Sequence, residues 1–151
     1  MFFFGMNKVL KTYLKLIVKP QIEATSYYQQ PTEHQEFMRG SLFYEEHVSC
    51  YIFSLIYIAI QQQHLSKPTK HYCDAYDYLF SAGSRDLLKR GSFLWNNPDS
   101  KHAADKMFQL AKSNVALFTS QLESGELPNY NTIQKMIEDN PLVKEINSVF
   151  N

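Results

Sequence analysis

The sequence predicts an all-α fold in which about six to eight helices pack around one central buried helix. Apolar residues recur at steps of three and four positions over long stretches, as they do on the inner face of a helix. Only five Gly and six Pro occur in 151 residues, so turns are few and elements are long. Hydrophobic residues make up 44% of the chain, which is enough for a core. We therefore expect residues 1–151 to form a single helical domain.

The first predicted helix covers residues 7–19. Asn7 is a suitable N-cap, and Pro20 either stops this helix or begins a new segment. The lysines form one narrow stripe, which fits a solvated face; the alternative is a basic amphipathic helix that binds a membrane or a partner. The two faces consist of Lys8, Lys11, Lys15 and Lys19 on one side, and of Val9, Leu10, Tyr13, Leu14, Leu16 and Ile17 on the other.

The central helix is predicted at about residues 41–64. Between Val48 and Ile60 apolar side chains point in nearly every direction, so neighbours should surround this segment. A buried strand has a similar composition, but the length of the segment favours a helix. Before it, residues 20–32 are predicted as a loop or short helix, and Thr32 with Gln35 resembles a capping box.

Four further segments complete the predicted bundle. Pro68 opens a helix that ends near Gly83, and a short helix over residues 84–90 is closed by Gly91. Residues 93–95, Phe-Leu-Trp, then form an aromatic plug. A long helix runs from Asn97 or Pro98 to about Leu122, with Gly125 as its terminator. Helices over residues 131–139 and 141–150 end the chain.

The charge balance and the cysteines set bounds on partners and location. Fifteen basic and fifteen acidic residues cancel, so no overall field draws the chain to nucleic acid or to an anionic membrane. The two cysteines, Cys50 and Cys73, fall in apolar helical patterns and do not make a disulfide framework. We therefore expect a cytoplasmic protein whose partner is neither a membrane nor nucleic acid.

The sequence contains few groups arranged for catalysis. No His-Glu-x-x-His pair and no glycine-rich phosphate loop occur among its motifs, and we expect no metal or other cofactor. Two histidines lie one helical turn from a carboxylate, and two such pairs could meet in space. An alternative function is therefore a helical hydrolase or nuclease whose site is assembled from His71, Asp74, His102 and Asp105.

Acidic and tyrosine residues give the sequence its most distinctive surface. Such a surface suits a basic protein partner, since opposite charge speeds association and tyrosine is common in binding hot spots. The interpretation is a non-catalytic protein-binding module, most specifically an inhibitor of the immunity or antitoxin type that neutralises a toxic nuclease. No motif indicates a family. The predicted partner-binding residues are Glu33, Glu36, Glu45, Glu46, Asp74, Asp77 and Tyr78.

Overall fold

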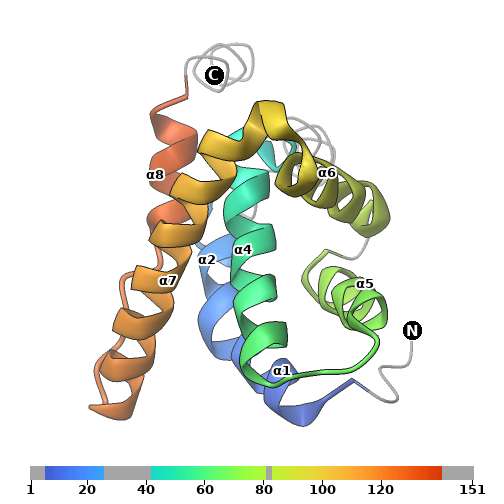
Figure 1. Ribbon diagram of the computed structural model, residues 1–151. Coiled ribbons are helices and arrows are strands. Elements are labelled where there is room, and N and C mark those ends of the chain that lie inside the picture. The colour runs from blue at the N-terminus through green and yellow to red at the C-terminus, as the bar shows by residue number, and fades with distance from the viewer. Residues whose placement is uncertain (1–5, 26–41, 81–82, 141–151) are drawn as a thin grey trace.

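The computed structural model describes residues 6–25, 42–80 and 83–140 (Figure 1). Within these ranges every regular element is a helix, which confirms the predicted all-α class. α1, η1 and α2 are consecutive turns of one rod, so this part of the chain forms six helices. The elements are α1 (Lys8–Tyr13), η1 (Leu14–Val18), α2 (Lys19–Glu23), α4 (Glu46–Gln62), α5 (Pro68–Leu79), α6 (Ser84–Asn96), η3 (Pro98–Ser100), α7 (Lys101–Glu123) and α8 (Thr132–Glu138).

Helix α4 is the predicted central helix. Twelve of its 17 residues are buried, and they lie on every side of the helix rather than on one stripe. Figure 1 shows α7 on one side of α4 and α5 and α6 on the other, with the N-terminal rod behind. The helix begins at Glu46 because the Glu45 carboxylate accepts a hydrogen bond from the Val48 N–H (2.9 Å) and caps it.

The N-terminal rod, Lys8–Glu23, begins where the sequence predicts and ends later. The Asn7 side chain caps it by accepting hydrogen bonds from the N–H groups of Val9 (2.8 Å) and Leu10 (3.1 Å). Pro20 does not stop the rod: it occupies the first turn of α2, where a missing N–H does no harm. The π-helical turn η1 joins the two α-helical parts.

A hydrogen-bond network, buried at Tyr51 and Gln21 and partly buried at Asn114, joins the rod to three other helices. The Tyr51 hydroxyl of α4 donates to Gln21 Oε1 of α2 (2.6 Å) and accepts from Asn114 Nδ2 of α7 (2.9 Å). Asn114 Nδ2 also donates to Thr132 Oγ1 at the start of α8 (3.0 Å). Buried polar groups satisfied in this way fix the relative positions of helices, because each alternative arrangement leaves a polar atom without a partner.

Helix α6 corrects the prediction of a short helix closed by Gly91. It runs through this glycine to Asn96, so the aromatic residues 93–95 belong to the same helix. Gly91 is buried, and a Cβ atom there would lie 3.0 Å from the Tyr76 hydroxyl and 3.2 Å from Phe53. The glycine therefore allows α6 to approach α4 and α5 closely, and it does not end the helix.

The end of α7 follows the prediction. Gly125 has φ +77°, and its N–H donates to the Leu122 carbonyl (3.1 Å), while the Glu126 N–H donates to that of Gln121 (2.8 Å). These two bonds are the Schellman motif that typically ends a helix. Helix α8 occupies the predicted 131–139 segment, whereas the predicted capping box at Thr32 and the helix over 141–150 lie outside the described residues.

Candidate functional site

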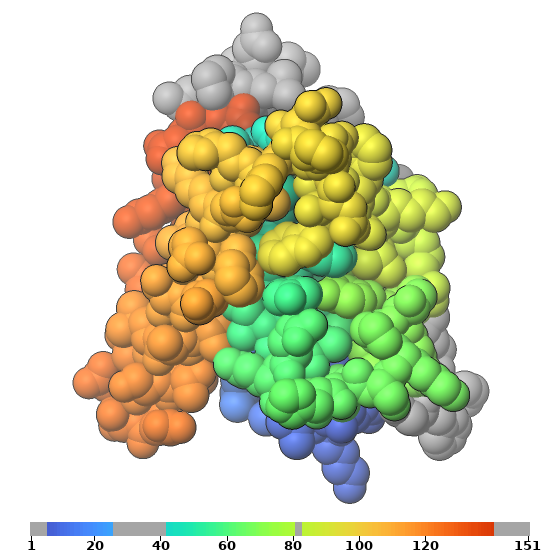
Figure 2. Space-filling model, viewed as in Figure 1, coloured from blue at the N-terminus to red at the C-terminus, as the bar shows by residue number. Residues whose placement is uncertain are grey.

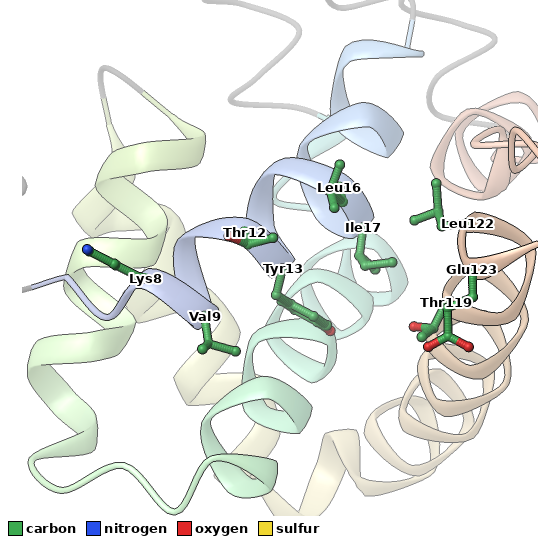
Figure 3. Close-up of a pocket in the computed structure, with 9 residues that line it drawn as sticks. All are labelled: Lys8, Val9, Thr12, Tyr13, Leu16, Ile17, Thr119, Leu122 and Glu123. Atoms are coloured by element: carbon green, nitrogen blue, oxygen red, sulfur yellow. The ribbon is translucent and has the colours of Figure 1, made fainter. Parts of the chain in front are cut away.

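An apolar groove lies between the N-terminal rod and α7. It encloses about 530 Å³, which is within the size range of protein ligand sites. Figure 3 shows the side chains of Ile17 on the rod and of Leu122 and Thr119 on α7 facing one another across the groove. The nine lining residues are Lys8, Val9, Thr12, Tyr13, Leu16, Ile17, Thr119, Leu122 and Glu123.

The groove exposes apolar side chains that the sequence assigns to a buried face. Leu10 and Leu14 of the rod are fully buried, whereas Val9 is 63% exposed and Leu16 is 43% exposed. The apolar arc of the rod is therefore wider than the surface that the other described helices cover. A continuous apolar surface of this kind marks a binding site more often than isolated exposed apolar residues do.

The rod is held in place at Leu16 by a contact from a distant part of the chain. Pro20 lacks the N–H that would bond to the Leu16 carbonyl in an α-helix. The Tyr130 hydroxyl, in the segment between α7 and α8, donates to this carbonyl instead (2.8 Å). Because π-helical turns such as η1 occur frequently at functional sites, the irregular backbone beside Leu16 supports a role for this groove.

Tyr13 anchors the rod at the inner side of the groove. Its hydroxyl donates to the Leu55 carbonyl of α4, and burial, together with the nearby Tyr51, raises the pKa of this phenol. The hydroxyl therefore stays protonated and remains a hydrogen-bond donor. The exposed charges at the rim are one of each sign, Lys8 and Glu123, so the groove carries no net formal charge.

The structure places the predicted acidic residues in two groups. Glu45 and Glu46 lie at the start of α4, where Glu45 acts as the cap and also contacts His47 Nδ1 (3.1 Å). Asp74 and Asp77 lie on α5. Glu33 and Glu36 fall outside the described residues. The four described residues therefore belong to two different helices.

The carboxylates of α5 are used within the chain. Asp74 forms an ion pair with Lys70 one turn earlier (2.7 Å). The Asp77 carboxylate is only 7% exposed, and it accepts hydrogen bonds from Ser84 Oγ (2.6 Å) and Arg85 Nη2 (2.9 Å). Tyr78 is half-buried, with the Lys19 ammonium 4.8 Å from its ring centre. These contacts join α5 to α6 and to the N-terminal rod.

The aspartates of the predicted His and Asp pairs also have local contacts. Asp105 pairs with Lys101 (2.9 Å), as Asp74 pairs with Lys70, so both carboxylates meet a lysine on their own helix. Residues 6–25, 42–80 and 83–140 contain no group of three or more His, Cys, Asp or Glu side chains that could hold a metal ion. His71 and His102 lie within these ranges.

The two thiols differ in their surroundings. Cys50 is fully buried in α4, and burial, reinforced by the nearby Glu46 and Glu45 carboxylates, raises its pKa to about 11. It is therefore a protonated thiol at neutral pH and a poor nucleophile. Cys73 on α5 is partly exposed, and neither cysteine forms a disulfide.

Comparison with known proteins gives no relative. No family model matches the chain, no curated protein matches it, and no solved structure matches it. No helix in the described ranges is both long and apolar enough to cross a membrane.

The groove was not predicted, although the sequence contains a signal for it. Six apolar residues on the rod spread over an arc of about 160°, which is wider than the stripe of about 100° that one packing contact requires. The second wall could not be predicted, because it depends on where α7 packs against the rod.

Proposed function

We propose that this chain is a non-catalytic protein-binding module and that the groove between the N-terminal rod and α7 binds an amphipathic helix of its partner. The observation that carries this proposal is the exposure of Val9 and Leu16 beside a cavity of about 530 Å³. Burial of such side chains against a partner releases roughly 25 cal/mol per Å² of apolar surface.

The shape of the groove favours a helix as the occupant. Both of its walls are helices, whose backbone groups are already paired, so an extended peptide would find no strand edge to join. The lining residues of the rod extend over about three turns, roughly 15 Å. A partner helix with apolar residues at every third or fourth position would match this length.

A more specific form of the proposal is an inhibitor of the immunity or antitoxin type, which would neutralise a toxic partner. Four of the predicted acidic residues lie in the described part of the chain. Of these, Glu46 has no hydrogen-bond or ion-pair partner there and is available to a basic target. Asp74 and Asp77 are paired internally, so we assign the main contact to the groove. Loss of the partner's activity on addition of one equivalent of this chain would test the inhibitory form.

The experiment compares two variants that carry the same substitution. Leu16→Glu places a charge at the groove, whereas Leu117→Glu places one at an α7 residue that is 51% exposed and does not line the groove. We expect the wild type and Leu117→Glu to capture the same protein from the source cells, and Leu16→Glu to lose it. The captured protein is then purified, and NMR of the present chain maps the surface at which it contacts the captured protein.

Two results would contradict the proposal. One is equal capture by both variants, because the groove would then have no part in binding. The other is a contact surface that excludes Val9, Leu16 and Leu122.

A further inference from the structure

A second groove, lined by aromatic rings, lies between α4, α5 and α6. It encloses about 610 Å³, and its aromatic residues are Phe53, Tyr57, Tyr72, Phe93 and Trp95. The three helices meet on the face of the molecule that Figure 2 shows, with α6 in yellow and α4 and α5 in green. This aromatic groove shares no lining residue with the groove beside the N-terminal rod.

The rings form a continuous wall. Phe53 and Tyr72 are stacked, with centres 4.8 Å apart and planes inclined by 7°. Trp95 lies 5.3 Å from Phe53 and 5.0 Å from Tyr57, measured between ring centres. Phe93 extends the wall outward and is 59% exposed. These packed rings hold one another in fixed positions, so little side-chain freedom is lost when a ligand binds.

Three residues that line the aromatic groove carry hydrogen-bond donors without partners in the described part of the chain. The hydroxyls of Tyr57 and Tyr72 and the indole N–H of Trp95 make no hydrogen bond within residues 6–25, 42–80 and 83–140. Burial, with a smaller effect of Tyr57, raises the pKa of the Tyr72 phenol, which therefore stays protonated. The fitting ligand is one that supplies carbonyl acceptors.

The charge of the aromatic groove limits its ligand further. Lys89 is its one charged lining residue, and it has no carboxylate partner among the residues that the structure describes. A cation held against the rings would be repelled by this ammonium, whereas an acidic side chain would pair with it. The groove therefore favours a ligand that is rich in carbonyl groups and locally negative.

We propose that the aromatic groove binds a proline-rich segment of a partner protein in the polyproline II conformation, with an acidic residue next to the prolines. Proline rings pack against aromatic faces, and this conformation leaves every carbonyl free while proline has no N–H to satisfy. A helix would have no free carbonyls for the three donors. Preformed polyproline II also loses little entropy when it binds.

The surface beyond Trp95 supports an extended ligand. A neighbouring hollow of about 360 Å³ shares Trp95 and Asn96 with the aromatic groove and continues to Pro98 and Asp105. Trp95 therefore stands between two adjoining hollows. A polyproline II segment advances by about 3.1 Å per residue, so a segment of several residues can occupy both sides of the indole ring.

Fluorescence titration tests this proposal, because Trp95 is the only tryptophan of the chain. The ligand is decaproline with one glutamate at each end, and the comparison peptide has glycine and serine in place of the prolines. We expect a saturable change in Trp95 emission with the first peptide and none with the second. Leu16→Glu should leave this titration unchanged, so it separates the two grooves.

Two variants assign the response to the aromatic groove. Phe93→Ala removes an exposed ring without disturbing the core, and we expect about a two- to tenfold rise in Kd. The matched control is Leu127→Ala, at a residue that is 85% exposed and lies outside the groove. Lys89→Glu should reverse the preference from glutamate-flanked to lysine-flanked decaproline.

Three results would overturn the proposal. In the first, the glycine–serine peptide gives the same response as decaproline. In the second, tetramethylammonium changes Trp95 emission and decaproline does not, which would indicate a cation site. In the third, the emission depends on protein concentration alone, which would mean that a second copy of the chain covers the groove.

Discussion

The Tyr51 hydroxyl donates a hydrogen bond of 2.6 Å to Gln21 Oε1, and both residues are completely buried. Thirty positions separate them in the sequence, and the bond links α2 to α4. Gln21 Nε2 in turn donates to the Ile17 carbonyl (2.8 Å), and Ile17 lines the groove beside the N-terminal rod. The buried network therefore supports one wall of the candidate site.

Tyr51→Phe should destabilise the protein. The substitution leaves Gln21 Oε1 buried without its donor and removes an acceptor from Asn114, which costs about 1–3 kcal/mol for an unsatisfied buried group. Urea unfolding followed by circular dichroism measures the change. The control is Tyr44→Phe, because the Tyr44 hydroxyl makes one exposed bond of 3.3 Å and its loss should change stability little.

The double variant Tyr51→Phe with Gln21→Leu completes this test. Replacing both partners removes the unsatisfied atom, so we expect part of the lost stability to return. Strictly additive losses would show that the bond between the two residues does not couple α2 to α4.

Gly91→Ala should also destabilise the protein, although alanine is the better helix former by about 1 kcal/mol. The added methyl group would lie 3.0 Å from the Tyr76 hydroxyl and 3.2 Å from Phe53, so α6 would have to move away from α4. Overpacking of this kind costs about 1–3 kcal/mol. The control is Ser113→Ala on the exposed side of α7, where thermal unfolding should show no loss. A more stable Gly91→Ala variant would contradict the close approach.

A second variant tests whether the close contact with Tyr76 causes this loss of stability. The Tyr76 hydroxyl is buried without a hydrogen-bond partner in the described part of the chain. Tyr76→Phe removes the atom closest to the new methyl group and should recover part of the stability that Gly91→Ala loses.

Asp77→Asn should lower stability, mainly near neutral pH. Burial acts to raise the pKa of this carboxyl, but the hydrogen bonds from Arg85 and Ser84 outweigh it and lower the pKa below the ordinary value of 3.8. The charged form therefore stabilises the folded state above about pH 4, and the stabilisation is lost as the pH falls below this value. We expect a loss of about 1 kcal/mol at pH 7. Urea unfolding at pH 7 and pH 3 measures it, with Asp74→Asn as the control.

Cys50 should resist thiol reagents in the folded protein. Burial, aided by Glu46 and Glu45, raises its pKa to about 11, so the reactive thiolate is scarce at pH 8. We expect labelling of the partly exposed Cys73 alone until denaturant is added. A free thiol in the unfolded chain ionises near its ordinary pKa of 9.0, so this group's contribution to stability is complete below pH 9 and is lost between about pH 9 and 11. Equal labelling rates would contradict this prediction.

Local sequence signals predicted most of the fold. Four residues lie at helix ends as predicted, because helix capping and helix termination depend on neighbouring residues alone. They are Asn7, Pro68, Gly125 and Asn131. At Gly91 the same local signals wrongly predicted a helix end. A glycine can end a helix or admit a neighbouring helix, and only the position of Phe53 and Tyr76 shows which role applies.

The candidate sites could be predicted only in part. The wide apolar arc of residues 8–17 and the aromatic residues 93–95 were visible in the sequence. Their use as groove walls was not, since each groove requires residues from distant segments, Leu122 in one case and Tyr72 in the other. The predicted function as an inhibitor of a basic partner stays a prediction, and so does the cytoplasmic location.

Photo-crosslinking within the source cells tests the central claim most directly. Benzoylphenylalanine replaces Leu16 in one variant and Leu117 in the other, so the reactive group stands at the groove or away from it. We predict one crosslinked protein from position 16, joined through an amphipathic helix, and no such product from position 117. Absence of a crosslink from position 16, or the same product from both positions, would contradict the assignment of this groove as the binding site.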